Sequence, residues 1–196
     1  MSIRIPNGQS LHRGTPSVGD EIQSVDLTIG GCEVVPFPAE VAEMVDLEAM
    51  FAAAGISLGN GDEIATTHNE GAIRYAIKLS QEAHNTICEW RERGLEVLLH
   101  TPLEGVTTRA IIGSRRPKTV VLQTEDGVAY VAVSVEHKVC FVEALPIGGE
   151  EQMVNLLAHI NQDFNLGKAR FILLGESSKG CYKTIKKYFR RVRCEK

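Results

Sequence analysis

Cys181 is the residue of this chain whose surroundings best suit chemistry. It follows a short apolar run, residues 171–174, and it opens a segment that mixes apolar side chains with lysines and arginines. A thiol at the start of a helix lies at the positive end of the backbone dipole, and nearby cations also favour the thiolate. The pattern therefore predicts a nucleophilic cysteine, which would attack an acyl group and form a thioester.

Hydrophobic periodicity predicts the elements that would position this cysteine. Alternating apolar residues with turn signals between them indicate antiparallel strands at 118–124, 128–135 and 138–145. The pattern becomes helical at 150–164, where apolar residues recur at helical spacing. A short buried strand at 169–174 then leads to a last helix at 179–193.

The first half of the chain has a different pattern. Residues 1–37 are rich in Gly, Pro and Ser, which predicts an irregular arm. We expect helices at 39–54 and at 67–93, the second opening with a capping box, and strands at 95–99 and 107–112. Strands grouped in the middle of the chain and flanked by helices predict an α+β fold with a central mixed or antiparallel sheet.

This organisation predicts an irregular N-terminal arm, residues 1–37, and a single α+β domain, residues 38–196. The domain would have a helical part at 38–94 and a sheet-plus-helix part at 95–196.

Composition excludes several classes of protein. An apolar content of 43% is that of a globular chain, and no run reaches the roughly 18 apolar residues of a transmembrane helix. The first residues lack the charged start and apolar core of a signal peptide. The five cysteines form no zinc-ligand spacing, so we predict no metal site and a cytoplasmic protein with reduced thiols.

The net charge of −4 hides a strong asymmetry. Residues 179–196 hold eight Lys or Arg and one Glu, so this end of the chain is expected to attract anions. The acidic remainder would repel a phosphate backbone, which makes nucleic acid an unfavoured partner. The predicted anion-binding residues are Lys183, Lys186, Lys187, Arg190 and Arg191.

The stretch from about residue 118 to 192 resembles the YopJ-type acetyltransferases and, more broadly, the ubiquitin-like-protease clan. The matching segments are residues 127–133, 139–144 and 177–181. The resemblance implies a thiol-protease-like fold, with Glu143 as the catalytic acid and Cys181 as the nucleophile. It also implies acetyl-coenzyme A as a cofactor, an inositol polyphosphate as activator, and an effector delivered into a host cell.

The base of that family has no counterpart here. The family's histidine position falls near Val128 or Ala129, where this chain has no histidine. His137 lies in the predicted hairpin turn, six residues of about 3.3 Å each from Glu143, which is roughly 20 Å. A base must lie within about 3 Å of its partner. We therefore predict an impaired enzyme or a pseudoenzyme, whose remaining activity would be acyl transfer or peptide cleavage through Cys181.

Two alternatives stay open beside this hypothesis. The chain could be a non-catalytic, protein-binding adaptor module whose basic C-terminal helix binds an anion, with Cys181 only packed. It could also be ADP-ribosyltransferase-like, because residues 11–15 resemble the first arginine motif of those enzymes, although the Ser-Thr-Ser strand that they need is missing. A protein partner is expected under both the effector and the adaptor hypotheses.

Overall fold

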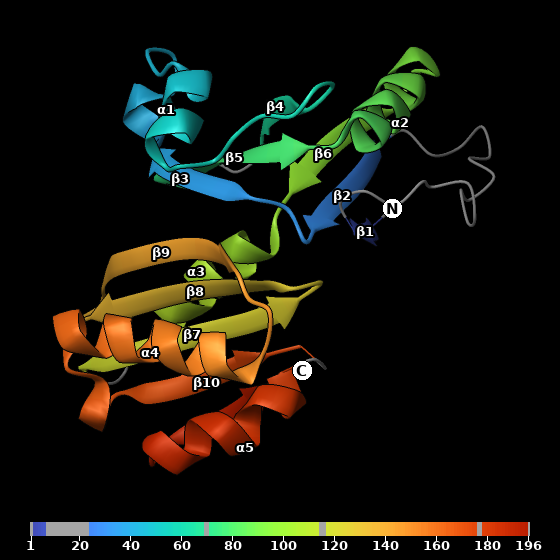
Figure 1. Cartoon of the computed structure of the whole chain (residues 1–196). Helices are drawn as coiled ribbons and strands as arrows, with labels where there is room; N and C mark the ends of the chain where they lie inside the picture. The colour runs from blue at the N-terminus through green and yellow to red at the C-terminus, as the bar shows by residue number, and fades with distance from the viewer. Residues whose placement is uncertain (1, 7–23, 69–70, 114–116, 176–177, 196) are drawn as a thin grey trace. The chain divides into compact units, whose positions relative to one another are not determined.

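The structure, a computed structural model, describes residues 2–6, 24–68, 71–113, 117–175 and 178–195 (Figure 1). The chain divides into two compact units, Met1–Thr101 and Pro102–Lys196. Each unit combines sheets with helices, which confirms the predicted α+β class. The domain boundaries predicted from the sequence, an arm at 1–37 followed by one domain, stay a prediction. Among the described residues, no helix is both long and apolar enough to span a lipid bilayer.

Unit 1 contains two three-stranded sheets. The strands β1, β2 and β6 are parallel, and β3, β5 and β4 are antiparallel, each set in that spatial order. The strands are β1 (Ser2–Pro6), β2 (Ser24–Gly30), β3 (Val34–Pro38), β4 (Glu63–Thr66), β5 (Ile73–Leu79) and β6 (Glu96–His100). The helices are η1 (Ala39–Val41), α1 (Leu47–Ala53) and α2 (Gln81–Glu92).

The long helix predicted at 67–93 is wrong in its first half, which contains strand β5. Thr67 does not open a helix, because its N–H donates to the carbonyl of Tyr75 at 2.9 Å. The helix begins only after Ser80, whose hydroxyl accepts the N–H of Ala83 at 3.3 Å. Apolar residues at helical spacing therefore concealed a buried strand followed by a capped helix.

Two other predicted elements also differ. The helix predicted at 39–54 is the short η1 followed by α1, because the side chain of Asp46 caps the N–H of Ala49 and starts a new helix. The strand predicted at 107–112 belongs to a helix, α3 (Pro102–Ile112). Its β-branched residues suggested a strand, yet Thr107 donates its hydroxyl to the carbonyl of Leu103 at 2.7 Å inside that helix.

Unit 2 is built on one five-stranded sheet with the spatial order β11-β10-β7-β8-β9. The pairs β7–β8 and β8–β9 are antiparallel, whereas β10 is parallel to both β7 and β11. The strands are β7 (Lys118–Glu125), β8 (Val128–Val135), β9 (Lys138–Pro146), β10 (Arg170–Leu174) and β11 (Val192–Glu195). The helices that follow are α4 (Glu150–Phe164), η2 (Leu166–Lys168) and α5 (Ser178–Tyr188).

Local sequence explains the two hairpins of this sheet. Asp126 and Gly127 have φ angles of 47° and 77°, and Glu136 and His137 have 48° and 69°. Two-residue connections with positive φ at both positions match the right-handed twist of the strands that they join. The hairpins predicted at 118–145 are thereby confirmed, with each turn where the sequence placed it.

The two faces of the sheet are covered differently. Helices α4 and α5 pack on one face and α3 on the other (Figure 1). The core beneath α4 and α5 uses alternate residues of the central strands and apolar residues of the two helices. Phe171 of β10 and Phe189, just after α5, lie at its centre with ring centroids 4.1 Å apart. This core holds the strands and the two helices together, and a site lies at each end of these strands.

Candidate functional site

The carboxyl ends of β7, β9 and β10 meet at one edge of the sheet, and both α4 and α5 begin there. In α/β sheets, ligands bind outside the carboxyl ends of the strands. A pocket of about 370 Å³ opens at this edge, large enough for a small ligand. It is lined by Thr124, Ile147, Gly148, Gly149, Glu150, Met153, Gly180, Cys181 and Thr184.

The backbone at the start of α4 leaves amide donors facing this edge. Gly149 is the residue before the helix, with φ 155° and ψ −170°, a conformation that essentially only glycine adopts. It supplies no side-chain cap. The first N–H groups of an α-helix have no partner inside the helix, so a site at an uncapped helix N-terminus favours an anionic group.

Glu150 places a negative charge at the same pocket. Its Oε1 accepts a hydrogen bond from the hydroxyl of Thr184 at 2.5 Å and lies 3.6 Å from the Nζ of Lys187. The hydrogen bond from Thr184 lowers the pKa of the exposed Glu150 carboxyl, and the charge of Lys187 lowers it further. Glu150 is therefore ionised at neutral pH, and a bare phosphate would meet both helix dipoles and this carboxylate.

Cys181 lines the carboxyl-end pocket as a partly buried residue of α5. Its Sγ lies 3.8 Å from the Oγ1 of Thr124. No histidine is among the residues that line this pocket. The thiol also packs against the core. Cys181 lies in the first turn of α5, which is the position that the sequence predicted for it.

Glu143, the predicted catalytic acid, lies away from Cys181. In the register of the sheet, Thr124 is opposite Ala129, Ala129 is opposite Leu145, and Glu143 is two residues farther along β9. Two strand spacings and two residues along the strand put the Cα atoms of Glu143 and Thr124 about 12 Å apart. Partial burial raises the pKa of the Glu143 carboxyl, against a lowering by nearby His159. The structure does not bring the two predicted catalytic residues into one pocket, and their catalytic role stays a prediction.

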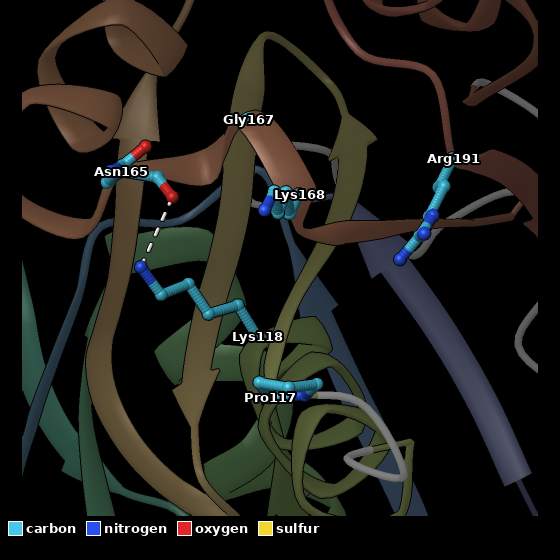
Figure 2. Close-up of a pocket in the computed structure, with 6 residues that line it drawn as sticks. All are labelled: Pro117, Lys118, Asn165, Gly167, Lys168 and Arg191. Atoms are coloured by element: carbon cyan, nitrogen blue, oxygen red, sulfur yellow. Dashed lines mark hydrogen bonds between the residues drawn. The ribbon is translucent and has the colours of Figure 1, made fainter.

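The amino ends of β7, β10 and β11 lie together at the opposite end of the strands. We call this end of the sheet the basic edge, because lysine and arginine side chains gather there. A pocket of about 700 Å³ there is lined by Pro117, Lys118, Asn165, Gly167, Lys168 and Arg191 (Figure 2). Figure 2 shows its cationic side chains coming from three places: β7, η2 and the connection before β11. A second hollow of about 450 Å³ is lined by Arg170, Arg190, Arg191, Val192 and Arg193.

The five predicted anion-binding residues separate in the structure. Arg190 and Arg191 line these basic hollows. Lys187 lies near Glu150 instead, and Lys186 donates to the hydroxyl of Tyr182 at 2.6 Å. Lys183 is exposed on α5. Binding of an anion by any of the five stays a prediction.

Sequence reasoning missed three further cations of the basic edge, which are Lys118, Lys168 and Arg170. A signal for them existed, because most of these residues begin a strand or lie close before one, and amino ends of parallel strands share an edge. The signal could not be used, because the last helix was predicted to run to residue 193 and β11 was not expected.

Comparison with known proteins shows the fold. No family model and no curated protein matches the chain. A solved protein from Bacteroides thetaiotaomicron, described as having an actin-like ATPase fold and unknown function, matches with a TM-score of 0.69 at 10% identity, over 88% of this chain and 68% of that one. The PilM–PilN type IV pilus biogenesis complex matches with a TM-score of 0.54 at 13% identity, over 88% of this chain and 69% of the other. The chain thus has the fold of actin-like ATPases.

This fold overturns the resemblance to YopJ-type acetyltransferases and the ubiquitin-like-protease clan. The thiol-protease-like architecture, the effector function and the description as an acetyltransferase-like pseudoenzyme are wrong. Acetyl-coenzyme A and an inositol polyphosphate were implied by that resemblance alone. It rested on the order of strands and helices around a cysteine, and such an order does not determine which strands are neighbours in the sheet. The ADP-ribosyltransferase motif at 11–15 lies outside the described residues.

Proposed function

We propose that unit 2 is a nucleotide-binding module that holds a magnesium nucleotide in the carboxyl-end pocket. One observation carries the proposal: α4 and α5 both begin at a single pocket beside the carboxyl ends of the strands, in a chain with the fold of actin-like ATPases. The positive ends of two helix dipoles supply a site where phosphate groups are stabilised without any lysine or arginine.

The charge of Glu150 decides the form of the ligand. An ionised carboxylate opposes a bare phosphate but suits a phosphate that carries a divalent cation. Magnesium in nucleotide sites is held by one or two carboxylates together with the substrate phosphates. Among the described residues that line the pocket, Glu150 is the one carboxylate, and the described part of the chain contains no cluster of three metal-ligating side chains. The residues therefore fit magnesium bound with the nucleotide and do not fit magnesium alone.

The other lining residues would serve binding rather than chemistry. Thr124 and Thr184 present hydroxyl groups, although that of Thr184 is donated to Glu150. The glycines before α4 let the backbone approach a phosphate closely. Met153 and Ile147 give the pocket an apolar side. When bound, the magnesium would neutralise phosphate charge beside Glu150.

A titration with a fluorescent ATP analogue tests the proposal. In the presence of magnesium the wild-type protein should bind the analogue saturably, and ATP should compete. Glu150→Gln removes the carboxylate proposed to hold the magnesium and should weaken binding of the magnesium nucleotide severalfold or more, because the attraction between the carboxylate and the divalent cation is lost.

Lys138→Glu is the matched control, since it makes a larger charge change at the exposed β8–β9 turn, away from the lining residues. Its affinity should equal that of the wild type. Absence of saturable binding by the wild type, or equal losses in the two variants, would contradict the proposal.

A further inference from the structure

A second surface of unit 2 lies between α4 and α5, away from the residues of the proposed nucleotide pocket except for Thr184. Here the two helices enclose a hollow of about 330 Å³. Most of its lining is apolar, and Tyr188 stands out because 62% of its surface is exposed. The lining residues are Val154, Leu157, Ala158, Asn161, Gly167, Thr184, Ile185, Tyr188 and Phe189.

This apolar hollow continues into the basic edge of the sheet. Gly167 lines both the apolar hollow and the pocket of Figure 2, and Arg191 lines both that pocket and the arginine-rich hollow beside it. The three hollows adjoin through these shared residues, and we call them together the α4–α5 groove. Its arginine-rich hollow reaches round the end of the sheet, because Arg170 and Arg193 lie one residue from Phe171 and Val192 in their strands and so project from the face opposite to α4 and α5. One end of the α4–α5 groove is apolar and aromatic, and the other is cationic.

The positive charge of the groove is not neutralised by the described part of the protein. Lys168, Arg170, Arg190 and Arg191 have no ion pair with any described residue. Their uncompensated charge contrasts with neighbouring cations that have local partners. Lys118 donates its Nζ to the carbonyls of Phe164 and Asn165 at the end of α4, at 2.7 and 3.2 Å.

Among the described residues, Glu195 at the end of β11 is the acidic partner of Arg193, which lines the arginine-rich hollow, and of Arg109 in α3. Its carboxylate accepts hydrogen bonds from Nε and Nη2 of Arg109, at 2.5 and 2.7 Å, and also forms an ion pair with Arg193. Even so, burial lowers the pKa of Arg193, and the charges of Arg170 and Arg109 lower it further. The local field therefore favours the arrival of an anion.

We propose that the α4–α5 groove binds an acidic segment of a partner protein, in which carboxylates lie next to a large apolar side chain. Arginine guanidinium groups match carboxylates in shape and charge and can bind them in a bidentate manner. The apolar hollow would receive the neighbouring side chain, as grooves between helices receive amphipathic segments.

A partner protein accounts for both ends of the groove, whereas a phosphate ligand accounts for only one. Phosphate groups would use Lys168 and Arg191 but would leave the apolar hollow beside Tyr188 unused. The partner is thus recognised by two independent features, charge complementarity and an apolar anchor, and loss of either should weaken binding.

The experiment is a selection of random 12-residue peptides displayed on phage against the full chain. Enriched peptides should place two or more Asp or Glu within about four residues of Leu, Ile, Phe or Tyr, the spacing of one helical turn. Labelled copies of the enriched peptides are then titrated against three variants. Arg191→Glu should weaken binding about tenfold or more by reversing a charge in the groove, and Tyr188→Ala should weaken it severalfold. Lys138→Glu, two strands across the sheet from Lys118, should weaken it much less than Arg191→Glu.

Three outcomes would overturn the proposal. One is the absence of enrichment, or enrichment of peptides whose affinity is the same in Arg191→Glu and wild type. Another is tighter binding of a single-stranded oligonucleotide with the same loss in Arg191→Glu, which would assign the groove to nucleic acid. The last is concentration-dependent self-association, measured by analytical ultracentrifugation, that disappears in both groove variants, because the occupant would then be a second copy of the chain. Far-ultraviolet circular dichroism confirms that each variant is folded.

Discussion

The two ends of the unit 2 sheet differ in the kind of charge that they present. The carboxyl end offers two helix N-termini and the carboxylate of Glu150, and none of the described side chains that line its pocket is a lysine or arginine. The amino end offers Lys168, Arg170, Arg190 and Arg191, with no carboxylate among the lining residues of its hollows. One sheet therefore separates a site suited to a metal-neutralised phosphate from a surface suited to carboxylates.

This contrast follows from the direction of the strands. Since β7, β9, β10 and β11 all point the same way, the helices that follow β9 and β10 begin at one edge and end near the other. Helix N-termini favour anions and helix C-termini favour cations. Lys118, whose ammonium group donates to carbonyls at the end of α4, illustrates the second preference.

Replacing Phe171 by alanine should have the largest effect, because both ends depend on the core that it occupies. Phe171 is fully buried and contacts Phe189. Removal of a buried phenylalanine side chain costs about 3–5 kcal/mol of folding free energy. Urea denaturation followed by circular dichroism measures the loss. Phe141→Ala, at a half-buried position on β9, is the control and should cost clearly less; equal losses would contradict the position assigned to this core.

Glu195→Gln should have the next largest effect; Glu195 lies at the carboxyl end of β11, opposite Leu174 of β10, and acts on the basic hollows through its partner Arg193. The change weakens the charge-assisted hydrogen bonds that Glu195 accepts from Arg109, and each such bond contributes about 1.5–3 kcal/mol. Thermal denaturation should show the destabilisation. Affinity for the acidic peptides should rise, since Arg193, which lines the groove, loses the negative charge that neutralises it. A variant that binds those peptides more weakly while remaining folded would contradict the role given to the basic edge.

Thr184→Val tests the carboxyl end through the titration of Glu150. The substitution keeps the shape of a buried residue and removes the hydroxyl that Glu150 accepts. Because that hydrogen bond lowers the pKa of Glu150, it stabilises the fold above the pKa of the unfolded state and is lost as the pH falls through the folded pKa.

The stability difference between wild type and Thr184→Val should accordingly be largest near neutral pH and shrink in acid. Carboxyl titration followed by nuclear magnetic resonance should show a higher pKa for Glu150 in the variant. A pKa of Glu150 that is unchanged by the substitution would show that this hydrogen bond does not hold the charge at the pocket.

Glu143→Gln should have the smallest effect on stability. Whether the substitution raises or lowers the stability tells whether Glu143 takes part in either site. Partial burial raises the pKa of Glu143, so its charged form is disfavoured in the folded state. That penalty is present above the folded pKa and disappears as the pH falls below the unfolded pKa. The variant should therefore be slightly more stable than wild type at neutral pH and equal to it in acid, as thermal denaturation at both pH values would show. Marked destabilisation at neutral pH would instead indicate a partnered, functional carboxylate.

Local signals were sufficient to predict the hairpins and α4. Asp126-Gly127 is a turn pair that adopts positive φ readily, and the apolar spacing of 150–164 gave the helix its observed bounds. Local signals failed at β5, because the spacing of its apolar residues fits one face of a helix as well as it fits a buried strand. They failed again at 107–112, where a β-branched run lies in a helix packed on the sheet.

The sites were harder to predict, because they depend on which strands are neighbours. Cys181 was recognised as the start of a helix, but its neighbour Thr124 lies 57 residues earlier in the chain. Lys118, Arg170 and Arg191 likewise meet only because β7, β10 and β11 are parallel neighbours. The same order of strands and helices is compatible with more than one sheet, and that ambiguity led from a largely correct set of elements in residues 118–188 to the wrong fold.

The most direct test of the nucleotide site uses Cys181 as a reporter. Iodoacetamide labelling, resolved for each cysteine by mass spectrometry, is compared with and without ATP and magnesium. Cys140 and Cys194 are exposed and lie outside the pocket, so they serve as internal controls. We predict that the nucleotide slows labelling of Cys181 severalfold and leaves the two controls unchanged. Labelling of Cys181 at the same rate in saturating ATP and magnesium would contradict the assignment of this pocket to a nucleotide.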